Sequence, residues 1–145
     1  MADLIWLHEG ALRRTHPVFA MAAVGTPALF IWDDDRFAAA HVGTRRRIFI
    51  LETLEELGVD LVDGDAAGLM PRLVAAHGTT RLLMPASPDP VLLRQAGEIR
   101  QALPDLKVEM VDDTPFVSLP KEPDLARFFR YWNKARKSAL RPHGV

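Results

Sequence analysis

Short apolar segments recur along the chain, and helical patterns separate most of them. Each is too short for a helix and is bounded by Gly, Pro or Asp, so each predicts a strand. Continuous apolar character, as in "LFIW" and "LLM", is typical of parallel strands that are covered on both faces. The five predicted strands are Leu4–Leu7, Ala28–Trp32, Asp60–Val62, Arg81–Met84 and Lys107–Val111.

The segments between the strands carry helix start and stop signals. They predict a short helix over Pro17–Val24, one capped by Thr44 and ended by Gly58, one over Ala66–His77, and one capped by Asp89 and ended by Pro104. Two helices have an apolar stripe at helical spacing. The stripes are Ile48, Leu51, Leu54 and Leu57 in the second helix, and Leu92, Ala96, Ile99 and Leu103 in the fourth.

Strands that alternate with helices predict βαβ units and a mostly parallel sheet. We therefore expect a five-stranded, three-layer α/β/α domain of the Rossmann-like type over residues 1–112. The stretch "DDTPFVSLPKEP" contains three prolines and predicts an extended linker over residues 113–123. A basic amphipathic helix is predicted over residues 124–140.

Composition and charge narrow the function. The apolar share of 48 % and the charged share of 26 % in 145 residues are ordinary for a soluble globular domain. The net charge of −1 favours neither nucleic acid nor membrane, although seven of the nine charged residues from 121 onward are basic. Without cysteine there are no disulfides, thiol nucleophiles or cysteine-bound metals. With no signal peptide and no apolar run of about 18 residues, we expect a cytoplasmic protein.

The carboxyl ends of parallel strands share one edge of a sheet, where ligands usually bind. Here that edge would hold His8–Gly10, Asp33–Asp35, Gly64–Asp65 and Pro85–Asp89. The first turn, "HEGALRR", matches neither the dinucleotide fingerprint nor the P-loop, which argues against NAD or P-loop chemistry. We found no histidine spacing for a metal and no G-x-S-x-G elbow, so no catalytic residue or metal site is predicted.

Several polar clusters each have two interpretations. The "DDD" at 33–35 suits a divalent cation or, more simply, a solvated loop with a helix cap. His8 and Glu9 suit an acid–base pair or a plain polar turn, because successive side chains diverge. The "RRR" at 45–47 opposes the helix dipole, so it serves an anion or a partner, or is a solvated first turn.

The C-terminal helix has three interpretations: core packing on its own domain, docking of a partner, or contact with nucleic acid. The last is the weakest, because a single basic helix is a common solvated face. The residues expected to bind a partner are Phe128, Arg130, Tyr131, Trp132 and Lys134.

The order of these segments resembles the N-terminal domain of the DNA photolyase and cryptochrome family. "LIWLHEGALRRTHPVF" keeps Leu4, Trp6 and Pro17 in step with the family's first strand and the turn that follows it. "LFIWDDD" is similar to its second strand, and "ASPDP" echoes its fourth-strand loop. The best single match is "RRIFILETLEELGVDLVDGD", which resembles the helix and strand between them.

The resemblance implies a stand-alone domain related to DNA photorepair or light sensing. The helical FAD domain of the family is absent, so the chain is not expected to repair DNA alone. The domain that it resembles often holds an antenna chromophore, namely a flavin, a deazaflavin or a folate. The departures lie in the turns. The Asp and the Arg of the family's D-L-R correspond here to Gly10 and Leu12. The family's D-N corresponds to Thr15–His16, and its fourth-strand Asp corresponds to Ser87.

We therefore expect a small-molecule-binding or partner-binding module. If a chromophore binds, Trp32 is expected to stack on its ring and Arg46 to bond to an anionic tail. Two alternatives stay open: an interaction module that docks a second copy or a separate FAD-domain protein through its last helix, and a nucleotide-binding protein of related fold. The predicted cofactor-binding residues are His8, Glu9, Trp32, Asp33, Arg46 and Ser87.

Overall fold

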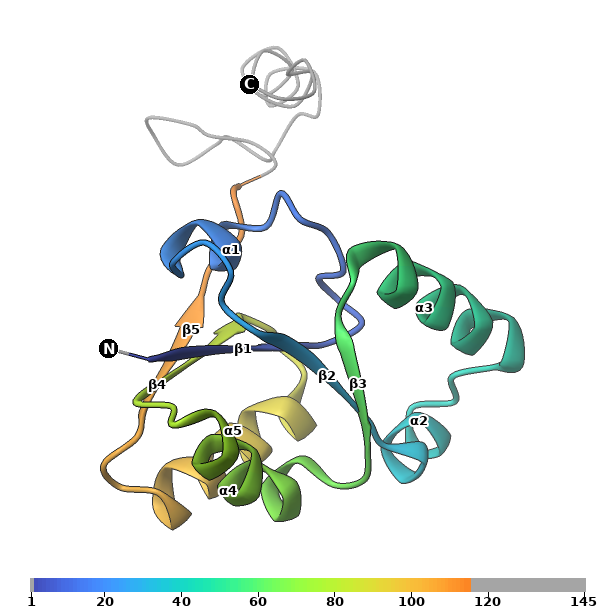
Figure 1. Ribbon diagram of the computed structural model, residues 1–145. Helices are drawn as coiled ribbons and strands as arrows, with labels where there is room; N and C mark the ends of the chain where they lie inside the picture. The colour runs from blue at the N-terminus through green and yellow to red at the C-terminus, as the bar shows by residue number, and fades with distance from the viewer. Residues whose placement is uncertain (1, 116–145) are drawn as a thin grey trace, which may run out of the picture. The chain divides into compact units, whose positions relative to one another are not determined.

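A computed structural model describes residues 2–115 of the chain (Figure 1). These residues make up nearly all of one compact unit, Met1–Asp113, and a second unit spans Thr114–Val145. The predicted helix over residues 124–140, the linker beyond residue 115 and the five residues expected to bind a partner lie outside the described residues.

The five predicted strands and the four predicted helices are all present, and one further helix, α2, was not predicted. The strands are β1 (Asp3–Leu7), β2 (Ala28–Trp32), β3 (Asp60–Asp63), β4 (Arg81–Pro85) and β5 (Lys107–Val111). The helices are α1 (Pro17–Met21), α2 (Asp34–Ala39), α3 (Thr44–Leu57), α4 (Ala66–His77) and α5 (Pro90–Ala102).

All neighbouring strands pair in parallel, in the order β3-β2-β1-β4-β5, which confirms the predicted Rossmann-like architecture. The chain starts at the central strand β1, builds outward to β3, and then returns to place β4 on the other side of β1. The direction of winding therefore reverses between β1 and β4. In open α/β sheets, ligands bind at such a reversal, beyond the carboxyl ends of the strands.

Each face of the sheet has its own core because alternate strand residues point to opposite faces. Leu4 and Trp6 of β1 belong to the core under α4 and α5, whereas Ile5 and Leu7 belong to the core under α1, α2 and α3. Figure 1 shows α4 and α5 together on one side of the sheet and α3 on the other. Burial on both faces explains why the strands read as continuous apolar runs.

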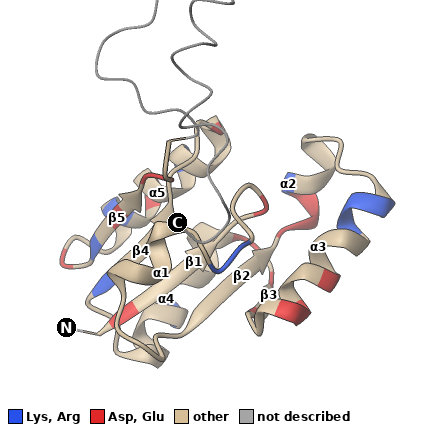
Figure 2. Cartoon of the chain, turned by 90° about the horizontal axis from the view of Figure 1, so that it is seen from above, with Lys and Arg blue, Asp and Glu red and all other residues tan. Residues whose placement is uncertain are grey.

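The start of α3 differs from the prediction. Gly43, not Thr44, is the N-cap residue, and no side chain bonds to the first turn. Figure 2 shows basic residues at this first turn and acidic residues farther along the helix, a distribution that opposes the helix dipole. The helix is therefore held by tertiary packing, and Gly58 in the left-handed conformation ends it (φ 66°).

The apolar stripe predicted for α3 is right only in part. Leu54 is buried together with Ile50, but Ile48 and Leu51 are exposed by 49 % and 42 %. Arg47 is half-buried, and its guanidinium lies over the ring of Phe37 at 5.4 Å. A stripe counted from apolar residues alone misses an arginine whose guanidinium packs on an aromatic ring.

None of the helices among the described residues is long and apolar enough to cross a membrane.

The burial of β4 between the two cores can be tested by mutation. Leu83 in β4 is fully buried, and we expect Leu83→Ala to lower the free energy of unfolding by about 2–5 kcal/mol. Leu93→Ala is the matched control, because Leu93 on α5 is 43 % exposed, and its effect should stay within about 0.5 kcal/mol. Denaturant titration measures both; equal losses would contradict this burial pattern.

Candidate functional site

The loops after β1 and β4 meet at the reversal of the sheet, and His8 joins them. Its Nε2 lies 2.9 Å from the carbonyl oxygen of Pro85, at the end of β4. The backbone N–H of Gly10 donates to its Nδ1 at 3.2 Å. A carbonyl only accepts and an N–H only donates, so these bonds fix His8 as the neutral tautomer with its proton on Nε2. Burial of the imidazole lowers the pKa of His8, because it disfavours the charged form.

Glu9 turns away from His8 and forms a buried ion pair with Arg36 of α2. Nη1 and Nη2 of Arg36 donate to the two carboxylate oxygens at 2.6 and 2.5 Å, and the two side chains are only 6 % and 12 % exposed. Burial alone would raise the pKa of Glu9, but the hydrogen bonds from Arg36 hold it below its usual value. Nη1 of Arg36 also lies 3.8 Å from Asp89. One guanidinium therefore links the loops that follow β1, β2 and β4.

Aspartates cap the three helices that start at this edge. Asp33 accepts from the backbone N–H of Arg36 at 3.1 Å at the start of α2. Asp65 caps α4 and Asp89 caps α5, each accepting a backbone N–H at 2.9 Å. Each carboxylate satisfies one free donor of a helix terminus and is stabilised by the positive end of the helix dipole.

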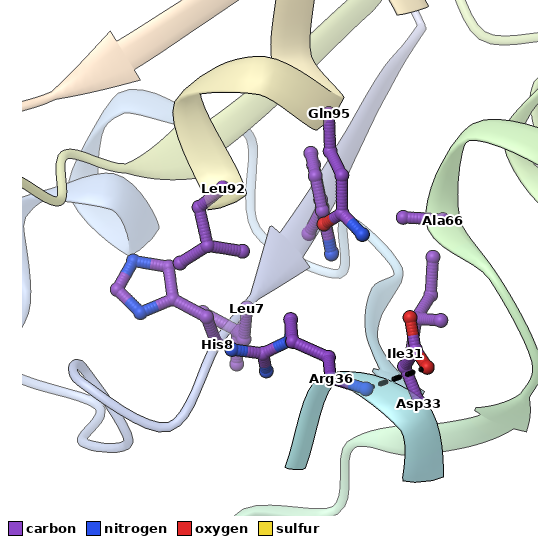
Figure 3. Close-up of a pocket in the computed structure, with 9 residues that line it drawn as sticks. Leu7, His8, Ile31, Asp33, Arg36, Ala66, Leu92 and Gln95 are labelled. Atoms are coloured by element: carbon purple, nitrogen blue, oxygen red, sulfur yellow. Dashed lines mark hydrogen bonds between the residues drawn. The ribbon is translucent and has the colours of Figure 1, made fainter. Parts of the chain in front are cut away.

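A cavity of about 630 Å³ opens among these helix starts. Its volume lies within the range of small-molecule sites, about 300–1,000 Å³. The lining residues are Asp33, Asp35, Arg36, Ala39, Ala40, Asp65, Asp89, Val91, Arg94 and Gln95. A second cavity of about 10 Å³, the size of one water, lies deeper (Figure 3). His8, Asp33, Arg36 and Gln95 are among the residues that line it, and Asp33, Arg36 and Gln95 line both cavities.

The predicted cofactor residues separate into two sets. His8, Glu9 and Asp33 come together at this edge of the sheet, and Ser87 lies in the same β4 loop, where its hydroxyl accepts from the N–H of Asp89 at 3.1 Å. Trp32 instead packs on the α2 side of the sheet, edge-on to Phe37 with ring centroids 4.8 Å apart.

Arg46 is exposed on α3 and lines neither of these two cavities. Its neighbour Arg47 turns toward α2 and bonds to Asp34 at 3.3 Å.

The contacts of the "DDD" cluster at 33–35 agree with a loop that ends in a helix cap. Asp33 caps α2, and Asp34 accepts hydrogen bonds from Trp32 and Arg47. Within residues 2–115, no group of three His, Asp or Glu side chains is close enough to hold a metal ion.

Sequence reasoning missed Arg36 and Gln95. Each residue has an unusual sequence neighbourhood that could have indicated its role. Arg36 is a charged residue beside Phe37, in a segment for which no helix was predicted. Gln95 lies on α5 next to the buried Ala96, between Leu92 and Ile99, where a polar residue is unusual. Burial of a polar side chain inside an apolar stripe was the observation to follow.

No protein-family model matches the chain, and no curated protein matches its sequence.

Removing only one partner of the buried Glu9–Arg36 ion pair should strongly destabilise the fold. We expect Arg36→Met to lower the free energy of unfolding by about 3–5 kcal/mol, because Glu9 would be left buried and unpaired. The double variant Glu9→Leu with Arg36→Met removes both charges and should be more stable than Arg36→Met alone. Chemical denaturation measures the cycle; strictly additive losses would contradict direct coupling of the two residues.

His8 should make the fold sensitive to mild acid. Its pKa is lowered in the folded state from an ordinary value of 6.5, so the unfolded chain takes up a proton first as the pH falls. The stabilisation is complete above about pH 6.5 and is lost as the pH falls toward the folded-state pKa. We expect the free energy of unfolding to decrease between about pH 7.5 and 5.5, and His8→Gln to flatten that slope.

His16 is also buried with a lowered pKa and accounts for part of the slope. His77→Gln makes the same substitution at an exposed histidine and serves as the matched control. An unchanged slope in His8→Gln would show that His8 titrates alike in the folded and unfolded states.

Proposed function

We propose that the chain contains a photolyase-type α/β domain that binds a small organic ligand at the carboxyl edge of its sheet. The observation that carries the proposal is the cavity of about 630 Å³ at the starts of α2, α4 and α5. It adjoins the reversal between β1 and β4, where ligands bind in sheets of this kind. An antenna-type chromophore is the ligand that the sequence resemblance suggests.

The placement of the matching segments supports this proposal. "LIWLHEG" supplies β1 and the first turn of the edge, "LFIWDDD" supplies β2 and the cap of α2, and "ASPDP" supplies the β4 loop. "RRIFILETLEELGVDLVDGD" runs through α3 and β3 to the cap of α4. Each stretch that resembles the family thus includes a strand of the sheet or a loop at its carboxyl edge.

The bonding at this edge favours binding over acid–base catalysis. Both ring nitrogens of His8 are engaged by backbone groups, and both carboxylate oxygens of Glu9 are engaged by Arg36. A general acid or base needs a proton site that faces a substrate. These two residues instead hold the loops that shape the cavity.

The test is occupancy of the cavity. We expect the purified protein either to carry a bound chromophore, visible as absorption at wavelengths longer than that of protein, or to gain melting temperature with riboflavin or a deazaflavin. A ligand at one hundred times its Kd stabilises the fold by about 2.7 kcal/mol.

Ala39→Trp should abolish the binding, because Ala39 lines the cavity and is exposed at the end of α2, where an indole can fill the space without disturbing the core. Ala38→Trp is the matched control, since Ala38 is its exposed neighbour and does not line the cavity. A colourless protein whose melting temperature shifts with none of the flavin, deazaflavin or folate probes would overturn the proposal.

A further inference from the structure

One buried polar side chain in the wall of the large cavity has no partner in the protein. Gln95 of α5 is 5 % exposed, and its side-chain amide makes no hydrogen bond to any residue in the described part of the chain. Figure 3, which draws the residues around the water-sized cavity, shows the amide pointing from α5 into the space beside Ala66. Among the described residues, the one fully buried side-chain polar atom without a partner is Oγ1 of Thr79, so the amide of Gln95 keeps some access to the cavities that the residue lines. Its donors and acceptor are therefore available to a molecule there.

Carboxylates dominate the charge of the same wall. Asp33, Asp35, Asp65 and Asp89 line the cavity. Asp33, Asp65 and Asp89 each accept a capping N–H through one oxygen. The second oxygen of Asp89 lies 3.8 Å from Nη1 of Arg36, whereas those of Asp33 and Asp65 are left for another contact. The positive ends of the helices, which would otherwise attract an anion, are thus already served by side chains of the protein.

The two guanidiniums of the wall do not reverse this balance. Arg36 is held by both oxygens of Glu9, which contributes a further negative charge beside the cavity. Arg94 is 67 % exposed and lies 3.7 Å from Glu98 along the same helix. A phosphate or carboxylate in the cavity would therefore face more like charge than opposite charge.

We propose that this cavity takes an organic cation that presents N–H donors, such as an amine, an amidine or a protonated heterocycle, with Gln95 bonding to one polar edge of it. The inference rests on the proposed function, since it names the ligand class of that same cavity. Carboxylates too widely spaced to hold a metal ion suit a ligand that reaches several of them at once. Riboflavin carries no charge at neutral pH, so the carboxylates do not repel it, whereas they do repel its phosphate ester.

A pair of probes with one ring and opposite charge tests the ligand class. Benzamidine carries a planar amidinium, and benzoate carries a carboxylate on the same ring. In calorimetric or NMR titrations at neutral pH and low salt, we expect benzamidine to bind with a Kd of about 1 mM and benzoate to bind at least tenfold more weakly. Riboflavin should likewise bind more tightly than its phosphate ester.

Three variants assign the contacts. Asp65→Asn removes a charge but keeps a capping side chain, so it should weaken benzamidine about threefold to tenfold while the fold remains intact. Gln95→Met keeps the length of the side chain without its amide, and it should weaken binding while leaving the melting temperature unchanged or raised. Asp105→Asn is the matched control, because Asp105 is exposed in the turn before β5, at the opposite edge of the sheet.

The outcomes separate this inference from the proposed function. Benzamidine binding that Ala39→Trp blocks and Asp65→Asn weakens would support the cationic ligand. Equal or tighter binding of benzoate or of the phosphate ester would overturn it, while the cavity would stand as a binding site. If neither probe binds, the cationic class is wrong; the proposed function falls with it only if the chromophores also fail to bind.

Discussion

The carboxyl edge of this sheet depends on one buried ion pair. Arg36 directly follows the "DDD" that begins α2, and its guanidinium donates to both carboxylate oxygens of Glu9, which lies in the turn after β1. A buried charge tolerates only a small set of geometries, because any displacement leaves it unpaired in a medium that solvates it poorly. The pair therefore fixes where α2 starts relative to β1, and α2 in turn supplies one wall of the cavity.

His8 completes the same arrangement with uncharged bonds. It closes the gap between the loops of β1 and β4, which in other sheets of this order is left for a ligand. The open volume is displaced toward the starts of α4 and α5 as a result. The Glu9–Arg36 ion pair and His8 thus hold the loops beside the cavity in place, and the capping aspartates Asp33, Asp65 and Asp89 line its wall.

The architecture was predictable from the sequence because it follows from local rules. Parallel strands covered on both faces are continuous apolar runs, and Asp65, Asp89, Gly58 and Gly78 mark helix ends by well-known conformational preferences. The candidate site was predictable only in part. His8, Glu9 and Asp33 follow from the geometry of parallel sheets. Arg36 was missed because its partner Glu9 is far along the chain, and Gln95 because its place in the cavity wall depends on how α5 packs.

Trp32 illustrates the same limit. Successive side chains of β2 point to opposite faces of the sheet, so the position of Trp32 in the strand decides where its indole lies. At this position the indole packs on Phe37 and does not face the cavity edge. Apolar composition marked the strand correctly without setting that direction. The α3 stripe was right only in part for a related reason, since Arg47 packs its guanidinium on the ring of Phe37 and a count of apolar residues does not include it.

The strand order has a consequence for how the protein is made. β1 is the first strand to leave the ribosome, yet one of its two neighbours is β4, whose pairing joins Asp3 to Arg81 across most of the domain. One edge of the central strand, with its apolar side chains, is unpaired until β4 has been synthesised. Such late pairings slow folding and leave strand edges open to other chains. In this fold, the residues that close the ligand edge, His8 and Pro85, meet only when that last central pairing forms.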